Sequence, residues 1–457
     1  MSALDCRAAG VLLLRLVLLA LPLKVAVAHP GDPHHEADAE PPYSGAAYLA
    51  SDGGAPAIAF PSSGVALRSW LPIPDLDPNA TAGNSCWGYV SASGREYALI
   101  GINTGTAVVE VTDPDAARLV AHLPGPTSIW RDIKTYQHFA YAVSEGGGGI
   151  QVFDLAAIDL GTITTLAAVT DGGTLSSHTV AINEQSGRLY RAGGQGVLQG
   201  LRVYSLAAAN APAFLGAWNN RYCHETQVVT WTKAPFAGVE VAFCYADDYS
   251  GGGNPGIEIL NVSDPGNISV IGSINLSQPP ILSHPAVYSH QGWLSPDRRY
   301  VYFDDEMDEH YAPYPLTTTR IIDVGDLTAP AQAGLFTNTT TARDHNQYTL
   351  GSRIFQANYR SGLRVLDATD PLVLSEIAYF DTYPEDDIAS YNGLWNVYPY
   401  FPSGTVIGSD IEKGLFVWSL DLAPPAPVPA LPGVGLGLLA ALVLAASLIA
   451  SRGVYRP

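Results

Sequence analysis

Seven copies of one short motif recur through this chain and constrain its fold more than any other feature. Each copy is a short apolar, β-rich run, such as Leu363–Leu366, that is closed by Asp, Asn or Ser. The copies start at Thr106, Gly149, Gly200, Gly256, Thr319, Gly362 and Gly414, which lie 43 to 63 residues apart. This spacing is typical of a four-stranded propeller blade with variable loops. The sequence therefore predicts an all-β chain that folds as a seven-bladed β-propeller.

A second recurring position precedes each copy, and we expect it to begin the strand that lines the central channel. The seven residues are Trp87, Trp130, His178, His224, His290, His345 and Asn392. Because the first strand of every propeller blade faces the channel, equivalent positions form a ring at one of its mouths. Four histidines are then neighbours on one side of that mouth, opposite two tryptophans and an asparagine.

The propeller is predicted to span residues 65–421, with its two ends joined in one blade. The stretch Val65–Leu71 resembles the segments that follow the repeats, such as Ala213–Trp218, while the last repeat has no such segment after it. We expect Val65–Leu71 to supply the missing outer strand, because a ring that closes in this way exposes no strand edge.

The segments outside the propeller predict export and anchoring. A basic start, an apolar stretch and a small-residue cleavage site are typical of a signal peptide, and a long uncharged run before terminal arginines is typical of a membrane span. We expect a periplasmic or cell-surface protein with one C-terminal transmembrane segment. The predicted parts are a signal peptide (1–28), a flexible His-, Pro- and acid-rich arm (29–64), a Pro-rich spacer (422–432), a transmembrane or sorting helix (433–450) and a basic cytoplasmic tail (451–457).

Composition excludes one class of partner. The chain has 457 residues, of which 47% are hydrophobic, so it can bury a large core. Its formal net charge is −20 and its pI is about 4.7. A protein that binds nucleic acid needs a basic surface, so we expect no nucleic-acid partner.

Six stretches of the chain match a known pattern: Trp130–Lys134, Ser176–Asn183, Ser289–Trp293, Asp344–Tyr348, Gln356–Arg360 and Tyr379–Glu385. In these stretches the chain resembles the choice-of-anchor B family, whose propeller carries the LVIVD-type repeat. The resemblance implies an exported domain joined to a C-terminal surface anchor and implies no established activity. The tail is similar to PEP-CTERM-like sorting signals, which implies a sorting protease as a partner, although Val428–Pro432 stands where such signals have a Pro-Glu-Pro core.

Acidic loops are expected to meet the ring histidines at the same channel mouth. These loops contain Glu145, Asp247, Asp248 and the run Asp304–His310. We predict that two or three of the four histidines hold a divalent metal ion, with Glu225 or Asp344 as the carboxylate ligand and Arg131 available for an anionic group. The alternative is that the histidines bond to backbone carbonyls of neighbouring blades and that the acids are solvated loop tips.

Two functional classes remain open. One is a surface binding or scaffold module for another protein or a glycan, and the other is a metal-dependent hydrolase or lyase that uses the same mouth. His224-Glu225 begins like a zincin motif, but Val228 occupies the place of its second histidine, and the sequence has no Walker loop or Gly-x-Ser-x-Gly elbow. The sequence therefore favours a binding module.

Two cysteines of the exported chain are predicted to pair. Cys223 and Cys244 flank a predicted pair of adjacent strands, and an exported chain permits a disulfide. Cys86 is then the odd thiol. The alternative is that all three are buried free thiols, since adjacent strands do not guarantee disulfide geometry.

Overall fold

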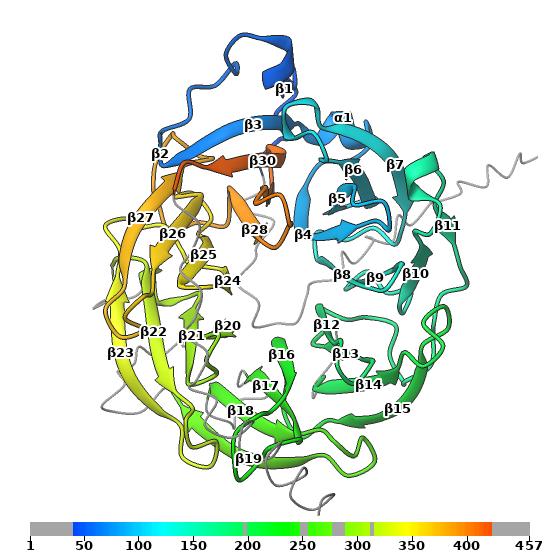
Figure 1. The fold of residues 1–457 in the computed structure, drawn as a ribbon, viewed down its shortest axis with the longest axis vertical. Coiled ribbons are helices and arrows are strands. Elements are labelled where there is room, and N and C mark those ends of the chain that lie inside the picture. The colour runs from blue at the N-terminus through cyan, green and yellow to red at the C-terminus, as the bar shows by residue number, and fades with distance from the viewer. Residues whose placement is uncertain (1–39, 195–198, 247–254, 277–287, 311–314, 423–457) are drawn as a thin grey trace, which may run out of the picture.

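Seven β-sheets surround a central channel (Figure 1). The computed structural model describes residues 40–194, 199–246, 255–276, 288–310 and 315–422. In five of the sheets the strand that comes first in the sequence lies nearest the channel, and the later strands follow outwards. In the other two sheets, strands from the N-terminal part of the chain are added at the outer edge. The predicted all-β, seven-bladed propeller is therefore confirmed.

Blades one to four each take four consecutive strands. Blades one and two contain β4 (Gly83–Val90), β5 (Glu96–Ile102), β6 (Gly105–Glu110), β7 (Arg118–Pro124), β8 (Arg131–Tyr136), β9 (Phe139–Ser144), β10 (Gln151–Asp154) and β11 (Thr164–Thr165). Blades three and four contain β12 (Thr179–Asn183), β13 (Arg188–Ala192), β14 (Leu201–Ser205), β15 (Ala213–Trp218), β16 (Glu225–Thr230), β17 (Glu240–Ala246), β18 (Gly256–Asn261) and β19 (Ser269–Asn275).

Blade six takes one strand and blade seven takes two strands from the N-terminal part of the chain. Blades five and six contain β20 (Ser289–Leu294), β21 (Tyr300–Asp305), β22 (Thr318–Asp323), β23 (Ala331–Thr337), β24 (Asn346–Leu350), β25 (Arg353–Ala357), β26 (Leu363–Asp367), β27 (Ser375–Phe380) and β2 (Ser62–Ser63). Blade seven contains β28 (Leu394–Tyr398), β29 (Val406–Asp410), β30 (Gly414–Leu420), β3 (Val65–Leu71) and β1 (Tyr48–Leu49).

The repeated motif forms the third strand of every blade. Its closing polar residue makes a turn into the fourth strand: the carboxylate of Asp113 accepts from the amide of Asp115, and that of Asp367 accepts from the amide of Thr369. The pairing of third with fourth strand contains a register shift in six blades. Such bulges increase the local twist, which suits an outer strand that must wrap around its blade.

The hydrophobic core lies between neighbouring blades. Each of the seven interfaces has its own apolar cluster, because the β-rich runs are buried on both faces of each sheet. The cluster between blades five and six is the smallest of the seven and contains Tyr302, Ile321, Ile354 and Leu366 among its members. Polar residues occupy much of the remaining space there, as described below.

The ring closes as predicted through β3. This strand pairs antiparallel with β30, so that Val65 lies opposite Leu420 and Leu71 opposite Leu415. The indole of Trp70 is fully buried, and its Nε1 donates to the backbone oxygen of Lys413 at 2.6 Å. Two segments 343 residues apart are thereby joined in one sheet.

The described part of the predicted flexible arm, residues 40–64, instead packs on the propeller. The ring of Tyr43 lies 4.5 Å from that of Trp70, and the ring of Phe60 lies 5.2 Å from it. Strand β2 pairs with β27, and Glu40 accepts a hydrogen bond from Tyr383 at 2.8 Å. The Pro- and acid-rich composition indicated a solvated arm, but its few aromatic side chains bury enough apolar surface to order it.

The predicted signal peptide, the spacer after Leu422, the transmembrane helix and the basic tail lie outside the described residues. Among the residues that the structure describes, no helix is long and apolar enough to cross a membrane.

Cys223 and Cys244 are joined in the structure, with a Cα–Cα distance of 5.4 Å, and Cys86 is a buried free thiol. The pairing stays a prediction about the protein in solution.

Candidate functional site

Four imidazoles form an arc at the channel mouth, which we call the histidine arc. It consists of His178, His224, His290 and His345, one from each of blades three to six. The ring centroids of successive members lie 4.1, 4.5 and 4.3 Å apart. Each residue stands at or just before the start of a first strand, so propeller geometry brings together side chains that are distant in the sequence.

Three members of the arc are oriented by the backbone of the next blade. Nδ1 of His224 lies 3.2 Å from the carbonyl oxygen of His290, and Nδ1 of His290 lies 3.0 Å from that of His345. Nδ1 of His345 lies 2.5 Å from the carbonyl oxygen of Trp395. A carbonyl can only accept, so Nδ1 carries the proton and Nε2 is left as the ligand atom when the ring is neutral. Metal-bound histidines usually have such a partner on their other nitrogen.

His178 ends the arc in a different way. Its Nδ1 lies 2.6 Å from Oε1 of Glu145, a residue that follows β9. Both side chains are buried, so this is a shielded ion pair when the imidazole is protonated.

Glu306 faces two members of the arc and completes a possible metal site. Its Oε1 lies 3.8 Å from Nε2 of His345 and 4.0 Å from Nε2 of His290. The three ligand atoms all lie within 4.8 Å of one another. Ligands at about 2.1 Å from a tetrahedral ion lie roughly 3.4 Å apart, so small side-chain movements suffice for all three to bind one ion. We call these residues the His-Glu-His group.

Tyr359 fixes the carboxylate of that group. Its hydroxyl donates to Oε1 of Glu306 at 2.7 Å, and its ring lies 4.7 Å from that of His345. Tyr359 is fully buried and adopts a positive φ of 39°, which is rare for a bulky residue. Backbone strain of this kind persists where the surrounding structure holds it in place. Here the strained residue, Tyr359, is the one that positions the candidate metal ligand Glu306.

The site is strongly charged when metal-free. Burial lowers the pKa of His290, but the charge of Glu306 and a hydrogen bond with Asp304 outweigh it and raise this pKa to about 9. Nδ1 of His290 lies 3.4 Å from Oδ1 of Asp304, besides its contact with the carbonyl of His345. Without a metal ion, His290 is therefore protonated at neutral pH, and a metal ion would have to displace that proton.

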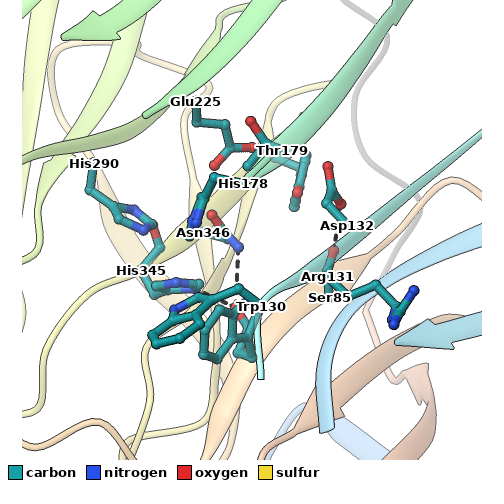
Figure 2. A pocket seen from close by; sticks show the side chains of 12 residues that line it. Ser85, Trp130, Arg131, Asp132, His178, Thr179, Glu225, His290, His345 and Asn346 are labelled. Atoms are coloured by element: carbon teal, nitrogen blue, oxygen red, sulfur yellow. Dashed lines mark hydrogen bonds between the residues drawn. The ribbon is translucent and has the colours of Figure 1, made fainter. Parts of the chain in front are cut away.

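A small cavity opens beside the group (Figure 2). Its volume is about 20 Å³, enough for a metal ion or about one water molecule but not for a sugar ring. The residues that line it are Ser85, Trp130, Arg131, Asp132, His178, Thr179, Glu225, His290, His345, Asn346, Tyr348 and Trp395.

Two further ionisable groups face the cavity from the other side. Asp132 accepts from the ammonium of Lys134 at 2.7 Å, from the hydroxyl of Ser85 at 2.7 Å and from the amide of Val180 at 2.9 Å. Burial and the nearby charge of Asp132 raise the pKa of Glu225 to about 7. Glu225 can therefore take or give a proton near neutral pH.

Six of the predicted site residues line this cavity: Trp130, Arg131, His178, Glu225, His290 and His345. His224 belongs to the arc but is not part of the lining. The Arg131 guanidinium points away, as Figure 2 shows, and donates to Gln151 at 2.8 Å and to the carbonyl of Pro126 at 2.6 Å. These contacts engage it outside the cavity.

Three other predicted residues lie apart from the cavity. Trp87 packs in the channel wall, with its ring 5.0 Å from that of Tyr398 and the ammonium of Lys134 4.5 Å from its centroid. Asn392 donates to Glu412 at 2.8 Å. Asp344 is buried among the acids of blade five.

Sequence reasoning did not single out Glu306, Tyr359 or Trp395. Glu306 lies within the acidic run Asp304–His310, which was expected at this mouth, but nothing in the run distinguishes it from its neighbours. The alternative interpretation of the histidines holds for Nδ1 of three of them, His224, His290 and His345, which do meet backbone carbonyls of the next blade. The acids of the run from Asp304 to Glu309 are buried, however, and are not solvated loop tips.

Comparison with known proteins shows no family for this chain. No protein-family model matches the chain, and no curated protein matches it. Similar solved structures include a protein from Lactobacillus plantarum, with 16% identity, a TM-score of 0.47 and coverage of 76% of this chain and 97% of the other. Kuenenia stuttgartiensis hydrazine synthase has 11% identity, a TM-score of 0.47 and coverage of 72% and 94%. A nidogen/laminin complex has 12% identity, a TM-score of 0.39 and coverage of 67% and 95%. Likeness at this level carries no argument about function.

Proposed function

We propose that this protein is a metal-binding β-propeller module that holds a divalent transition-metal ion at its channel mouth and uses it to bind a ligand. The observation that carries the proposal is the His-Glu-His group. Two imidazoles with Nδ1 engaged by backbone carbonyls present Nε2 toward one buried carboxylate. Two imidazole ligands and one carboxylate suit zinc and its neighbours in the first transition series better than calcium or magnesium.

The chain's own residues would supply three ligands and shield the ion from solvent. Such a site keeps a position open for a water molecule or for a donor atom of a ligand. His290 and His345 also line the cavity, and Trp130 and Trp395 form part of its wall. A carboxylate, imidazole or hydroxyl of a partner protein or glycan would fit as the donor, with the bulk of the partner remaining outside the cavity.

We propose further that the module works outside the cytoplasm. The signal-peptide pattern of residues 1–28 and the apolar run 433–450 support an exported, membrane-anchored protein, and the resemblance to the choice-of-anchor B family supports the same placement. A surface propeller on a tether is suited to binding or scaffolding.

Calorimetric titration of chelator-treated protein with Zn²⁺ tests the metal site. Wild type should bind about one ion, and His290→Ala or Glu306→Gln should weaken binding by more than about tenfold, since even supporting residues of metal sites contribute that much. His138→Ala is the matched control, because His138 is exposed in blade two, far from the group in the sequence. Equal affinity in wild type and His290→Ala, or no binding by a folded wild type, would rule the proposal out.

One observation favours the enzyme alternative. Glu225, with its pKa near 7, faces the same cavity and could act as a general base toward a water molecule activated by the ion. A metal-dependent hydrolase or lyase predicts turnover that Glu225→Gln abolishes while Zn²⁺ affinity is retained. A binding module predicts no turnover in either protein.

A further inference from the structure

A second group of buried acids lies beside the His-Glu-His group, between blades five and six. We call it the acid cluster and define it as Asp305, Asp308, Glu309 and Asp344. The first three come from the end of β21 and the short helix η5 (Asp308–His310), and Asp344 comes from the segment before β24. All four are buried. They occupy the interface that has the smallest apolar cluster of the propeller.

Backbone donors and one guanidinium satisfy part of the cluster. Asp305 accepts from the amides of Tyr288 at 2.9 Å and Met307 at 3.2 Å, and Glu309 accepts from the amide of Thr318 at 3.2 Å. Nη2 of Arg320 lies 2.9 Å from Asp308 and 4.0 Å from Asp305.

Asp344 is not satisfied in this way. Its side chain is 1% exposed, and neither carboxylate oxygen has a hydrogen-bond partner among the described residues. Burial, together with the charges of Asp304 and Asp308, raises its pKa well above the usual range. A buried polar group without a partner costs roughly 1–3 kcal/mol, and an unpaired charge costs more. A buried carboxyl group without a hydrogen-bond partner is normally part of a binding site.

The positive charge near the cluster does not balance it. Arg320 is the guanidinium that contacts these carboxylates in the described part of the chain. Arg343 is also buried close by, but its Nη1 donates to the backbone oxygen of Glu306 at 2.5 Å and its guanidinium lies 4.1 Å from the ring of Tyr391. Four carboxyl groups beside one paired guanidinium leave carboxyl oxygens that a divalent cation would bind on displacing their protons.

We propose that Asp308, Glu309 and Asp344 bind a hard divalent cation of the calcium class, in a site separate from the His-Glu-His group. The ligand atoms here are all oxygens, which calcium prefers and which distinguish the two sites. Asp308 and Glu309 each have one further carboxylate oxygen without a hydrogen-bond partner among the described residues. The ligand atoms of these three residues do not all lie within 4.8 Å of one another in the described chain, so the cation would have to draw Asp344 toward the other two.

The position of the cluster gives the cation a role. Glu306 lies between Asp305 and Asp308 in the sequence, so a cation bound to the cluster fixes the segment that carries this candidate transition-metal ligand. It also joins blade five to blade six where apolar packing is sparse. Calcium would thus order the interface and position Glu306, whether or not a transition metal is bound.

Thermal unfolding of chelator-treated protein with and without 5 mM Ca²⁺, a concentration of about the millimolar order that extracellular calcium modules require, tests this inference. Wild type should melt several degrees higher with Ca²⁺. Asp344→Asn should show no Ca²⁺ shift, because it removes one of the three carboxylate ligands. Asp264→Asn, in an exposed turn of blade four, is the matched control and should keep the full shift.

Two further variants separate this site from the transition-metal site. His290→Ala should keep the Ca²⁺ shift, and Asp344→Asn should still bind Zn²⁺, so either proposal can fail alone. Glu309→Gln provides an independent test if Asp344→Asn does not fold. The inference is overturned if wild type shows no Ca²⁺ shift, or if the shift persists in both Asp344→Asn and Glu309→Gln.

Discussion

At the scale of single residues, two groups at the channel mouth couple stability to pH in the same direction. The pKa of Glu225 is raised from 4.5 to about 7, chiefly by burial. The pKa of His290 is raised from 6.5 to about 9, because neighbouring acids outweigh its burial. In both cases the folded chain holds a proton more tightly than the unfolded chain. The stabilisation is fully present below each unfolded pKa and is lost as pH rises through the folded one.

We therefore expect the free energy of unfolding of the metal-free protein to fall between about pH 5 and pH 9. Glu225→Gln removes one of the two contributions, so this variant should be more stable than wild type at pH 8 by on the order of 2 kcal/mol and nearly equal to it at pH 5. Urea unfolding at the two pH values measures both differences. Glu184→Gln, at an exposed position, is the control. A difference between variant and wild type that does not change with pH would contradict the assignment.

The sequence could predict His178, His224, His290 and His345 because each occupies one register of a repeated unit. A repeat specifies where a side chain stands relative to its strand, and the propeller then brings equivalent positions together. Glu306 could not be predicted in this way. Its place depends on how one acidic segment leaves β21 and on the hydroxyl of Tyr359, a contact between residues 53 positions apart in the sequence.

At the scale of strands, bulges decide which residues complete the ring. The pairing of β28 with β29 shifts register between Leu394 and Asn396, so Trp395 is the extra residue that turns toward the cavity. The pairing of β20 with β21 shifts around His290 in the same way. Bulges often redirect side chains beside functional sites. An alignment of the repeats does not show such an added residue. For this reason the sequence predicts Asn392 at the ring position that Trp395 occupies.

Blade four contains the predicted disulfide. Cys244 lies in β17, and Cys223 lies two residues before the start of β16, so a bond between them ties the channel end of β16 to its neighbour. We expect thiol labelling of the unfolded, unreduced mature protein to modify Cys86 alone. Labelling after reduction should modify three cysteines. Three reactive thiols without reduction would exclude the bond.

Loss of the disulfide should destabilise the blade rather than the metal site. The bond closes a short loop of the unfolded chain, with a sequence separation of 21 residues. A loop of this length contributes about 3 kcal/mol in the chain-entropy description. Cys223→Ser with Cys244→Ser should therefore lower the free energy of unfolding by about this amount, while Zn²⁺ binding by the folded fraction is retained.

At the scale of the whole molecule, the propeller is a ring whose blades are stabilised mainly by their neighbours. Seven apolar clusters lie between blades, and the one between blades six and seven includes the closing strand through Val65 and Trp70. The repeats and the unpaired segments at the two ends were enough to predict this closure. The aromatic contacts of residues 40–64 were not predicted, because Tyr43 and Phe60 lie in a segment with no period.

Closure through β3 should control the stability of the entire domain, and Trp70 is its most buried large side chain. Its ring lies 5.5 Å from that of Phe416 in the partner strand, and its Nε1 is hydrogen-bonded to Lys413. Trp70→Ala leaves a cavity and a carbonyl without its donor, so the free energy of unfolding should fall by about 3–5 kcal/mol. Leu119→Ala, on the exposed outer strand of blade one, is the control and should change it by less than about 0.5 kcal/mol.

The form of the unfolding transition distinguishes closure from local packing. If β3 holds the ring together, the Trp70→Ala protein should still unfold in a single transition at lower urea concentration, because opening one blade exposes both of its neighbours. Removal of residues 1–39 should leave the transition unchanged, since the described contacts begin at Glu40. Removal of residues 1–71 should destabilise all blades together. A shortened chain of this kind that melts like the intact domain would show that the ring does not depend on β3.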